Sequence, residues 1–212
     1  MSKKQIILYF LPGIIAGILI SFFELRAIAI SAFIVYMVIY YSYYFYIMLF
    51  TKSVNLVDKF VNRRKKHPLY SLLIALVNKE LEEAEIYSEK LSMLYNQIKL
   101  SAKASILLEK KQSEEAAEII QKIKNPNIRN FNLALLALHK EDFELFENYK
   151  TQVKQQDLRY ALAAEAAYIR ENLVEAERLG DLAISSSAGL QKWTFVKSLA
   201  YQRNNENRQS YF

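Results

Sequence analysis

The 212-residue chain has no cysteine, a formal charge of +6 and 52% hydrophobic residues. The lack of cysteine excludes disulfides, thiolate catalysis and cysteine-ligated metal sites. The hydrophobic residues are concentrated in the first fifty positions, so a membrane anchor followed by one water-exposed domain fits the chain better than a single globule.

Most of the positive charge lies in one short segment. Residues 51–67 contain six basic side chains and one acidic one, whereas residues 68–212 contain nineteen basic and twenty acidic ones. A nearly neutral domain argues against a nucleic-acid surface. We therefore divide the chain into a membrane part (1–51), a basic juxtamembrane helix or linker (52–67) and a cytoplasmic helical domain (68–212).

Two membrane-spanning helices are predicted at the N-terminus. Ile6–Phe23 and Ala27–Phe50 are uncharged runs of 18 and 24 residues, close to the roughly 20 residues that a helix needs to cross a bilayer. Only residues 24–26 separate them, so we expect a tight antiparallel hairpin. A cleaved signal peptide is the alternative for the first run, because Lys3 and Lys4 precede it.

Basic residues flank both apolar runs and set the expected orientation. Lysines precede the first run, and a cluster of four basic residues follows the second: Arg63, Arg64, Lys65 and Lys66. Because basic residues are retained on the cytoplasmic side, both termini should be cytoplasmic in a multi-pass protein of the cell membrane. The cluster is also suited to anionic lipid headgroups, although topology is its simpler role.

The segment Asn55–Lys66 predicts a helix that lies close to the membrane. Its apolar side would carry Val57, Phe60 and Val61. A helix with one apolar and one basic side is typical of a membrane interface.

Small residues on the first span form a ridge for helix packing. Gly13, Gly17 and Ser21 recur every four residues, which lets a second helix approach closely. The second span of the same chain is the favoured neighbour. A second copy of the chain is the alternative, which would make the protein a homo-oligomer.

Tyrosines crowd the cytoplasmic half of the second span. An interfacial aromatic belt explains most of them. Tyr36 and Tyr40 lie deeper, so a partner membrane protein that contacts this face is a further hypothesis.

The region after Pro68 predicts helices joined by short turns, since it contains two glycines, one proline and no alternating strand pattern. Segments 110–120 and 170–180 are alike: a polar turn leads into a helix with a small residue, Ala116 or Ala176. They resemble the turn and second helix of a tetratricopeptide repeat.

Weaker copies place the marker positions at 84, 116, 146 and 176, separated by 32, 30 and 30 residues, slightly less than the usual ~34. Because one helix pair cannot bury its apolar stripe alone, stacking is expected. The predicted fold is all-α: a transmembrane helical hairpin followed by a tetratricopeptide-like (TPR-like) α-solenoid of about four degenerate helix pairs, plus a C-terminal capping helix. A generic helical bundle is the alternative.

Residues with catalytic or metal-binding chemistry do not converge. The chain has two histidines, His67 and His139, and its four glycines form no phosphate-binding loop. We therefore expect no enzymatic activity, no cofactor and no bound metal.

The resemblance to tetratricopeptide repeats implies a concave surface, built from the first helices, that binds an extended or helical peptide. In this register the groove residues are Phe131, Leu135, Leu138, His139, Glu165, Tyr168, Ile169, Ser198 and Tyr201. Their mixed apolar and mildly acidic character favours an apolar or basic segment of a protein partner.

The order of these parts is similar to the layout of the HemY proteins of Gram-negative bacteria, a likeness of plan from which no residue and no haem connection is carried over. Our leading hypothesis is a membrane-anchored scaffold or adaptor beside a membrane complex, with cell-envelope assembly as a candidate process. The alternative is an accessory subunit of a transporter or membrane enzyme that acts through its hairpin.

Overall fold

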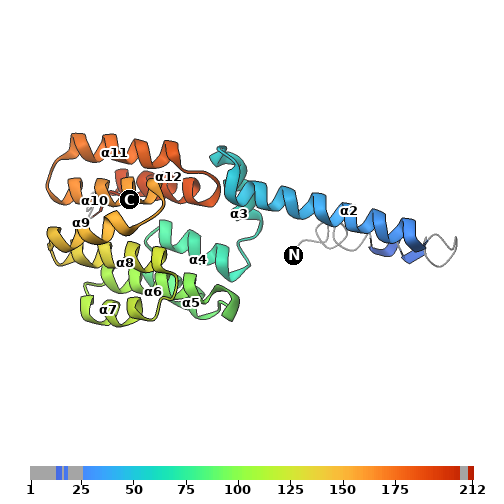
Figure 1. The fold of residues 1–212 in the computed structure, drawn as a ribbon, viewed down its shortest axis with the longest axis horizontal. Helices are drawn as coiled ribbons and strands as arrows, with labels where there is room; N and C mark the ends of the chain where they lie inside the picture. The colour runs from blue at the N-terminus through green and yellow to red at the C-terminus, as the bar shows by residue number, and fades with distance from the viewer. Residues whose placement is uncertain (1–12, 16, 19–25, 206–209) are drawn as a thin grey trace.

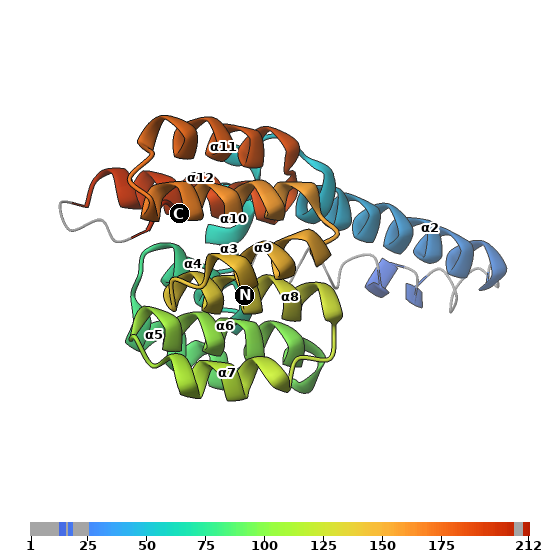
Figure 2. The ribbon, with the colours of Figure 1, turned by 60° about the vertical axis from the view of Figure 1, so that its left-hand side comes forward.

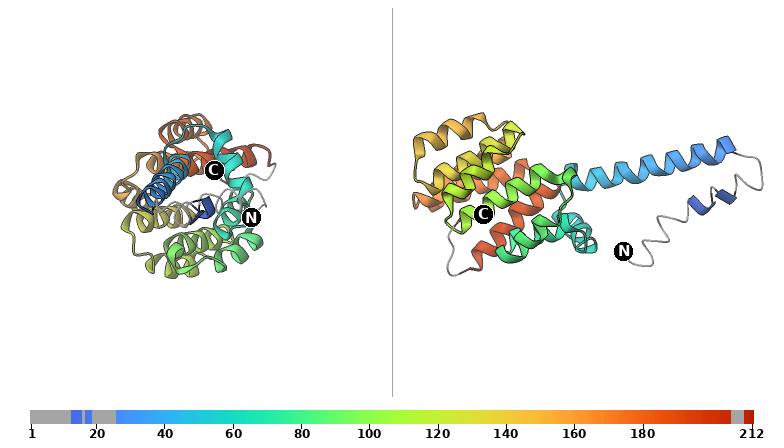
Figure 3. Two further views of the ribbon diagram at one scale, coloured as in Figure 1. Left: turned by 90° about the vertical axis from the view of Figure 1, so that its right-hand side faces the viewer. Right: turned by 90° about the horizontal axis from the view of Figure 1, so that it is seen from below.

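The computed structural model describes residues 13–15, 17–18, 26–205 and 210–212. Within these residues every regular element is helical. A long helix, α2 (Arg26–Phe45), continues through the π-helical turn η1 (Tyr46–Phe50) and projects from a stack of shorter helices (Figure 1). The view from below shows α2 standing clear of the stack along nearly its whole length (Figure 3).

The stack consists of helix pairs joined by tight turns. In chain order the pairs are α4 (Pro68–Val77) with α5 (Leu81–Glu89), α6 (Asn96–Glu109) with α7 (Ser113–Gln121), α8 (Pro126–His139) with α9 (Phe143–Gln152), and α10 (Gln156–Ile169) with α11 (Leu173–Ser186). Helix α3 (Val54–Arg63) precedes them, the short turn η2 (Met93–Tyr95) links α5 to α6, and α12 (Gly189–Arg203) follows. The pairs lie side by side in a solenoid-like packing (Figure 2).

All four pairs are closed by the same turn. At each turn one residue has a positive φ between 55° and 61°, and these residues are Lys79, Lys111, Glu141 and Glu171. In the second turn, the amide of Lys111 donates to the carbonyl of Leu108, and the amide of Gln112 donates to that of Leu107, both at 2.9 Å. The other three turns repeat this pattern. It is the Schellman motif, which ends a helix with one left-handed residue.

The marker positions of the sequence repeat are the points where neighbouring pairs meet. All four are fully buried, and they are Ala84, Ala116, Phe146 and Ala176. Each packs with a residue from the first helix of the next pair or from α12, and these partners are Ile106, Leu136, Leu162 and Leu199 in turn. The apolar core therefore runs from one pair to the next, as solenoid packing requires.

Helix α3 forms where a membrane-surface helix was expected, but its apolar side does not face a bilayer. Val57 packs with Ile47 of η1, Tyr70 of α4 and Trp193 of α12 in one buried cluster. Packing therefore runs across both expected domain boundaries, and the base of α2 is embedded in the helix stack.

Polar contacts reinforce this joint. Trp193 Nε1 donates to Asp58 Oδ1 at 2.9 Å, and Lys197 Nζ lies 2.8 Å from the same oxygen. The amide of Gly189 donates to the Thr51 carbonyl at 2.8 Å. An added Cβ at Gly189, which has a φ of +57°, would lie 2.0 Å from the carbonyl oxygen of Met48. Glycine at this position therefore lets α12 approach η1 closely.

Among the described residues, Ile30–Phe50 is the one helical segment long and apolar enough to cross a membrane. Most of the first predicted span, residues 6–23, lies outside the described residues, so the hairpin stays a prediction. Ser21 also lies outside them. An added Cβ at Gly13 or Gly17 would meet no described atom within 4 Å, so the small-residue ridge has no described neighbour.

Candidate functional site

A groove with a cavity of about 700 Å³ lies between the first helices of the pairs. The predicted groove residues that line it are Phe131, Leu135, Leu138, His139, Glu165, Ile169 and Ser198. The two other predicted residues lie outside the cavity: the ring of Tyr168 stands 6.3 Å from that of Tyr211, and Tyr201 is exposed.

Local sequence signals place the α8 wall of this groove. The side chain of Asn125 accepts hydrogen bonds from the amides of Asn127 and Ile128, and Pro126 occupies the first helical position. This combination of N-cap and proline starts a helix efficiently. Side chains four and seven positions after Phe131 then fall on the same helical face.

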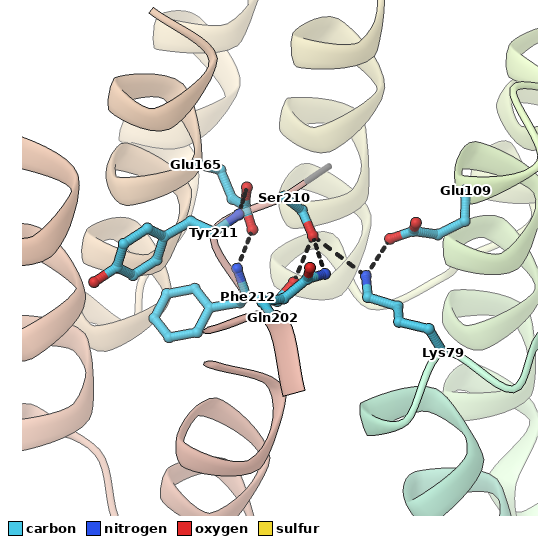
Figure 4. A network of polar contacts seen from close by, with 7 residues as sticks. All are labelled: Lys79, Glu109, Glu165, Gln202, Ser210, Tyr211 and Phe212. Carbon is cyan, nitrogen blue, oxygen red and sulfur yellow. Dashed lines mark hydrogen bonds and ion pairs between the residues drawn. The ribbon is translucent and has the colours of Figure 1, made fainter. Parts of the chain in front are cut away.

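The last three residues of the sequence, Ser210–Phe212, border the groove: Ser210 and Phe212 line its cavity, and Tyr211 packs beside it in a buried cluster with Tyr168 (Figure 4). The Glu165 carboxylate accepts a hydrogen bond from the backbone amide of Tyr211 and another from that of Phe212, each at 2.8 Å. These contacts involve only backbone amides of the segment, so they do not depend on its side chains. A carboxylate that receives two adjacent amides is thus a fixed anchor for a non-helical peptide.

Two aromatic seats hold the side chains of this segment. The Phe212 ring lies 4.9 Å from the ring of Phe195. Tyr211 is buried against Gly180, where an added Cβ would lie 2.3 Å from the Tyr211 ring. Only a residue without a side chain at position 180 leaves room for this ring.

Polar side chains link Ser210, at the edge of the groove, to distant helix pairs (Figure 4). The Ser210 hydroxyl accepts from Gln202 Nε2 at 2.7 Å and from Lys79 Nζ at 3.4 Å. Lys79 also forms an ion pair with Glu109. The segment therefore touches a network that runs from the α4–α5 turn to α12.

The pKa of the Glu165 carboxyl depends on the backbone amides that contact it. Burial raises the pKa of the Glu165 carboxyl above its ordinary value, and the amides of Tyr211 and Phe212 oppose that rise because they donate to the ionised form. The ionised carboxylate therefore depends on the amides of a bound segment.

Sequence reasoning assigned no role to Ser210–Phe212, to Lys79 or to Glu109. One signal was present: the aromatic pair Tyr211–Phe212 follows the wholly polar stretch 202–210. The Lys79–Glu109 pair joins residues thirty positions apart on two helix pairs, so it becomes visible only when the stacking is known.

The other predicted site residues lie away from the groove. Arg63, Lys65 and Lys66 are exposed, and the guanidinium of Arg64 stands 3.8 Å above the ring of Phe60. Tyr36 and Tyr40 stack on α2 with their ring centroids 6.3 Å apart. In the described part of the chain, no three His, Asp or Glu side chains are grouped as metal ligands would be.

No family model, curated protein or solved structure matches the chain. Its own geometry therefore has to indicate what the groove binds.

Proposed function

We propose that the protein is a membrane-anchored interaction scaffold with a TPR-like stack, whose groove binds a segment of a partner protein beside a membrane complex. One observation carries the proposal: a non-helical segment, Ser210–Phe212, lies along one side of the groove, and Glu165 accepts hydrogen bonds from its backbone amides while the rest of the cavity stays open. Grooves of stacked helices commonly bind peptides in this way.

The contacts of Ser210–Phe212 also serve as our guide to the chemistry of the partner segment. The backbone contacts to Glu165 accept any sequence, whereas the seats at Gly180 and Phe195 accept aromatic rings. We expect the partner to present a small polar residue followed by two aromatic residues. Residues 210–212 would then compete with the partner for the same groove.

The anchor completes this proposal. The segment Ile30–Phe50 would cross the cell membrane, as the second arm of a two-span hairpin with both termini in the cytoplasm. The groove would then be held close to the membrane, where a partner attached to a membrane complex can reach it.

Direct peptide binding tests the groove. The full chain and a variant that lacks residues 206–212 are purified in detergent micelles, and a fluorescein-labelled peptide of residues 204–212 is titrated in by anisotropy. The shortened variant should bind the peptide more tightly than the full chain, because its groove is free. A variant that keeps the helical circular dichroism of the full chain but binds no peptide would refute the proposal.

Glu165→Gln in the shortened variant tests whether the Glu165 carboxylate binds the peptide. This change keeps one acceptor and removes the charge, so binding should weaken about 10-fold or more, given ~1.5–3 kcal/mol for a charge-assisted hydrogen bond. Glu177→Gln, an exposed change on α11, is the control and should leave binding unchanged.

A second candidate function places the partner on α2. Most of its apolar side chains are exposed, and a shallow hollow is lined by residues that include Phe33, Met37 and Tyr41. An accessory subunit of a transporter or membrane enzyme would use this face. In that case Tyr36→Phe with Tyr40→Phe should reduce recovery of a co-purifying membrane protein, whereas Glu165→Gln should not.

A further inference from the structure

Two large apolar side chains stand almost fully in solvent at the turn between α5 and α6. Met93 is 95% exposed and Leu94 is 92% exposed. Their neighbours in sequence point inward, since Leu91 is buried and Tyr95 packs against the same cluster. The turn is thus anchored on both sides while its tip presents an apolar pair that contributes nothing to the core.

A group of basic side chains at the end of α3 is also without a partner. Arg63, Lys65 and Lys66 are exposed, and no carboxylate of the described residues lies within ion-pair distance of them. Carboxylates of α3 and α5 are already engaged: Asp58 pairs with Lys197, and Glu89 pairs with Lys99 and Lys103. The positive charge of the α3–α4 turn is therefore not neutralised within the described protein.

These two features are neighbours. The His67 ring, directly after the basic turn, lies 6.2 Å from the ring of Tyr95, directly after the apolar pair. Both the α3–α4 turn and the link from α5 to α6 lie on the side of the stack from which α2 projects (Figure 1). If α2 crosses a bilayer, this side of the stack faces the headgroups.

We propose that Arg63, Lys65, Lys66, Met93 and Leu94 form a lipid-docking surface that binds the anionic face of the bilayer that α2 enters. The basic side chains contact lipid phosphates and carboxylates, and the apolar pair enters the boundary between headgroups and acyl chains. Charge with adjacent exposed apolar residues is the combination that peripheral membrane segments use. The docked stack is then held at two places, at the base of α2 and at this surface.

Single labelled cysteines test this proposal in the full chain, which has no native cysteine. Met93→Cys or Leu94→Cys carries an environment-sensitive nitrobenzoxadiazole (NBD) label, and the protein is reconstituted into phosphatidylcholine bilayers with or without phosphatidylglycerol. We expect emission at shorter wavelength, and quenching by lipids spin-labelled near the headgroup, when phosphatidylglycerol is present. The matched control is Val174→Cys, which is 83% exposed at the start of α11, on the opposite side of the stack.

Two further variants separate the possible failures. Ile34→Cys on α2 reports insertion of the anchor itself, so its quenching shows that the bilayer is in place even if the docking surface stays in water. Arg63→Gln with Lys65→Gln and Lys66→Gln should bring quenching at position 94 down to the level at position 174. Arg64 stays, because it covers Phe60.

Labels at 93 and 94 that behave like the label at 174, while position 34 is quenched, overturn the proposal. Quenching that is the same without phosphatidylglycerol, or in the triple variant, overturns the role of anionic lipid. Neither result bears on the peptide groove, which lies on other residues.

Discussion

Gly180 decides whether the Tyr211 ring can pack against α11 and so hold residues 210–212 beside the groove. In Gly180→Ala the new methyl group would overlap the Tyr211 ring, while alanine favours the α11 helix by about 1 kcal/mol over glycine. We expect the segment to leave its place and the stack to lose the burial of the Tyr211 ring, which outweighs that gain at about 1.5–3 kcal/mol. Hydrogen exchange should show faster exchange of the Tyr211 and Phe212 amides. Asp181→Ala, an exposed neighbour, is the control, and amides that stay protected in Gly180→Ala would contradict the expectation.

The four left-handed turn residues are lysines and glutamates, for which a positive φ is unfavourable. Lys111→Gly should therefore stabilise the protein by about 0.5–1 kcal/mol, because glycine adopts this conformation without a Cβ clash. Glu118→Gly within α7 should have the opposite sign at similar size. Thermal unfolding of the full chain measures both, and a loss of stability in Lys111→Gly would count against strain at these turns.

These turns also show what residue chemistry can reveal beforehand. Polar composition correctly indicated where the helix pairs turn, but lysine and glutamate carry no preference for a left-handed backbone. Packing of each pair imposes that conformation, so the repeated Schellman motif was not predictable from the residue types.

At the scale of elements, α3 and α12 are joined through Asp58. The hydrogen bond from Lys197, then that from the Trp193 indole, and to a smaller extent the charge of Lys197, lower the pKa of Asp58 below its ordinary value of 3.8. A lowered pKa means that this stabilisation is complete above pH 3.8 and is lost as the pH falls through the folded-state pKa.

Asp58→Asn should therefore cost about 1 kcal/mol at neutral pH, a modest value because the site is partly exposed, and it should weaken the acid dependence of stability. Trp193 is the single tryptophan of the chain, so its fluorescence during unfolding reports this joint directly. Asp181→Asn is the exposed control. Equal acid dependence in Asp58→Asn and the parent chain would disprove the role of Asp58.

The helix pairs could be predicted from the period of 30 to 32 residues, because each marker position must be small or apolar to meet the next pair. The apolar side of α3 was predicted correctly, but it was expected to face the membrane and instead packs against other helices. Val57 and Phe60 show a helical stripe whether they face lipid or protein, and only the position of Trp193, more than a hundred residues later, decides between the two.

The helix residues that line the groove could be predicted, but the position of residues 210–212 beside them could not. The repeat register correctly predicted the groove residues on α8 and most of those on α10. It also predicted Tyr168 and Tyr201, which do not line the cavity. Residues 210–212 reach the groove through contacts with Glu165, 46 and 47 residues away in the sequence. No local pattern encodes such a contact.

For the whole molecule, the shared cluster at the base of α2 predicts that the helix stack depends on what precedes it. A chain that begins at Pro68 would lose Ile47, Val57 and Phe60 and expose Tyr70 and Trp193 to water. We expect Trp193 emission to shift to longer wavelength and the thermal midpoint to fall, relative to the full chain in detergent. A Pro68 chain with native emission and an unchanged midpoint would show that the stack is independent.

Helix α12 has two different neighbours on its two sides. Phe195 and Ser198 form one wall of the groove, while Trp193 and Gly189 meet α3 and η1. One continuous helix, α12, thus links the groove to the base of α2. If α2 crosses a bilayer and the groove binds a partner, as we propose, a tilt of α2 would move the groove with it, and a pull on the partner would reach α2 through contacts such as the Gly189–Thr51 hydrogen bond.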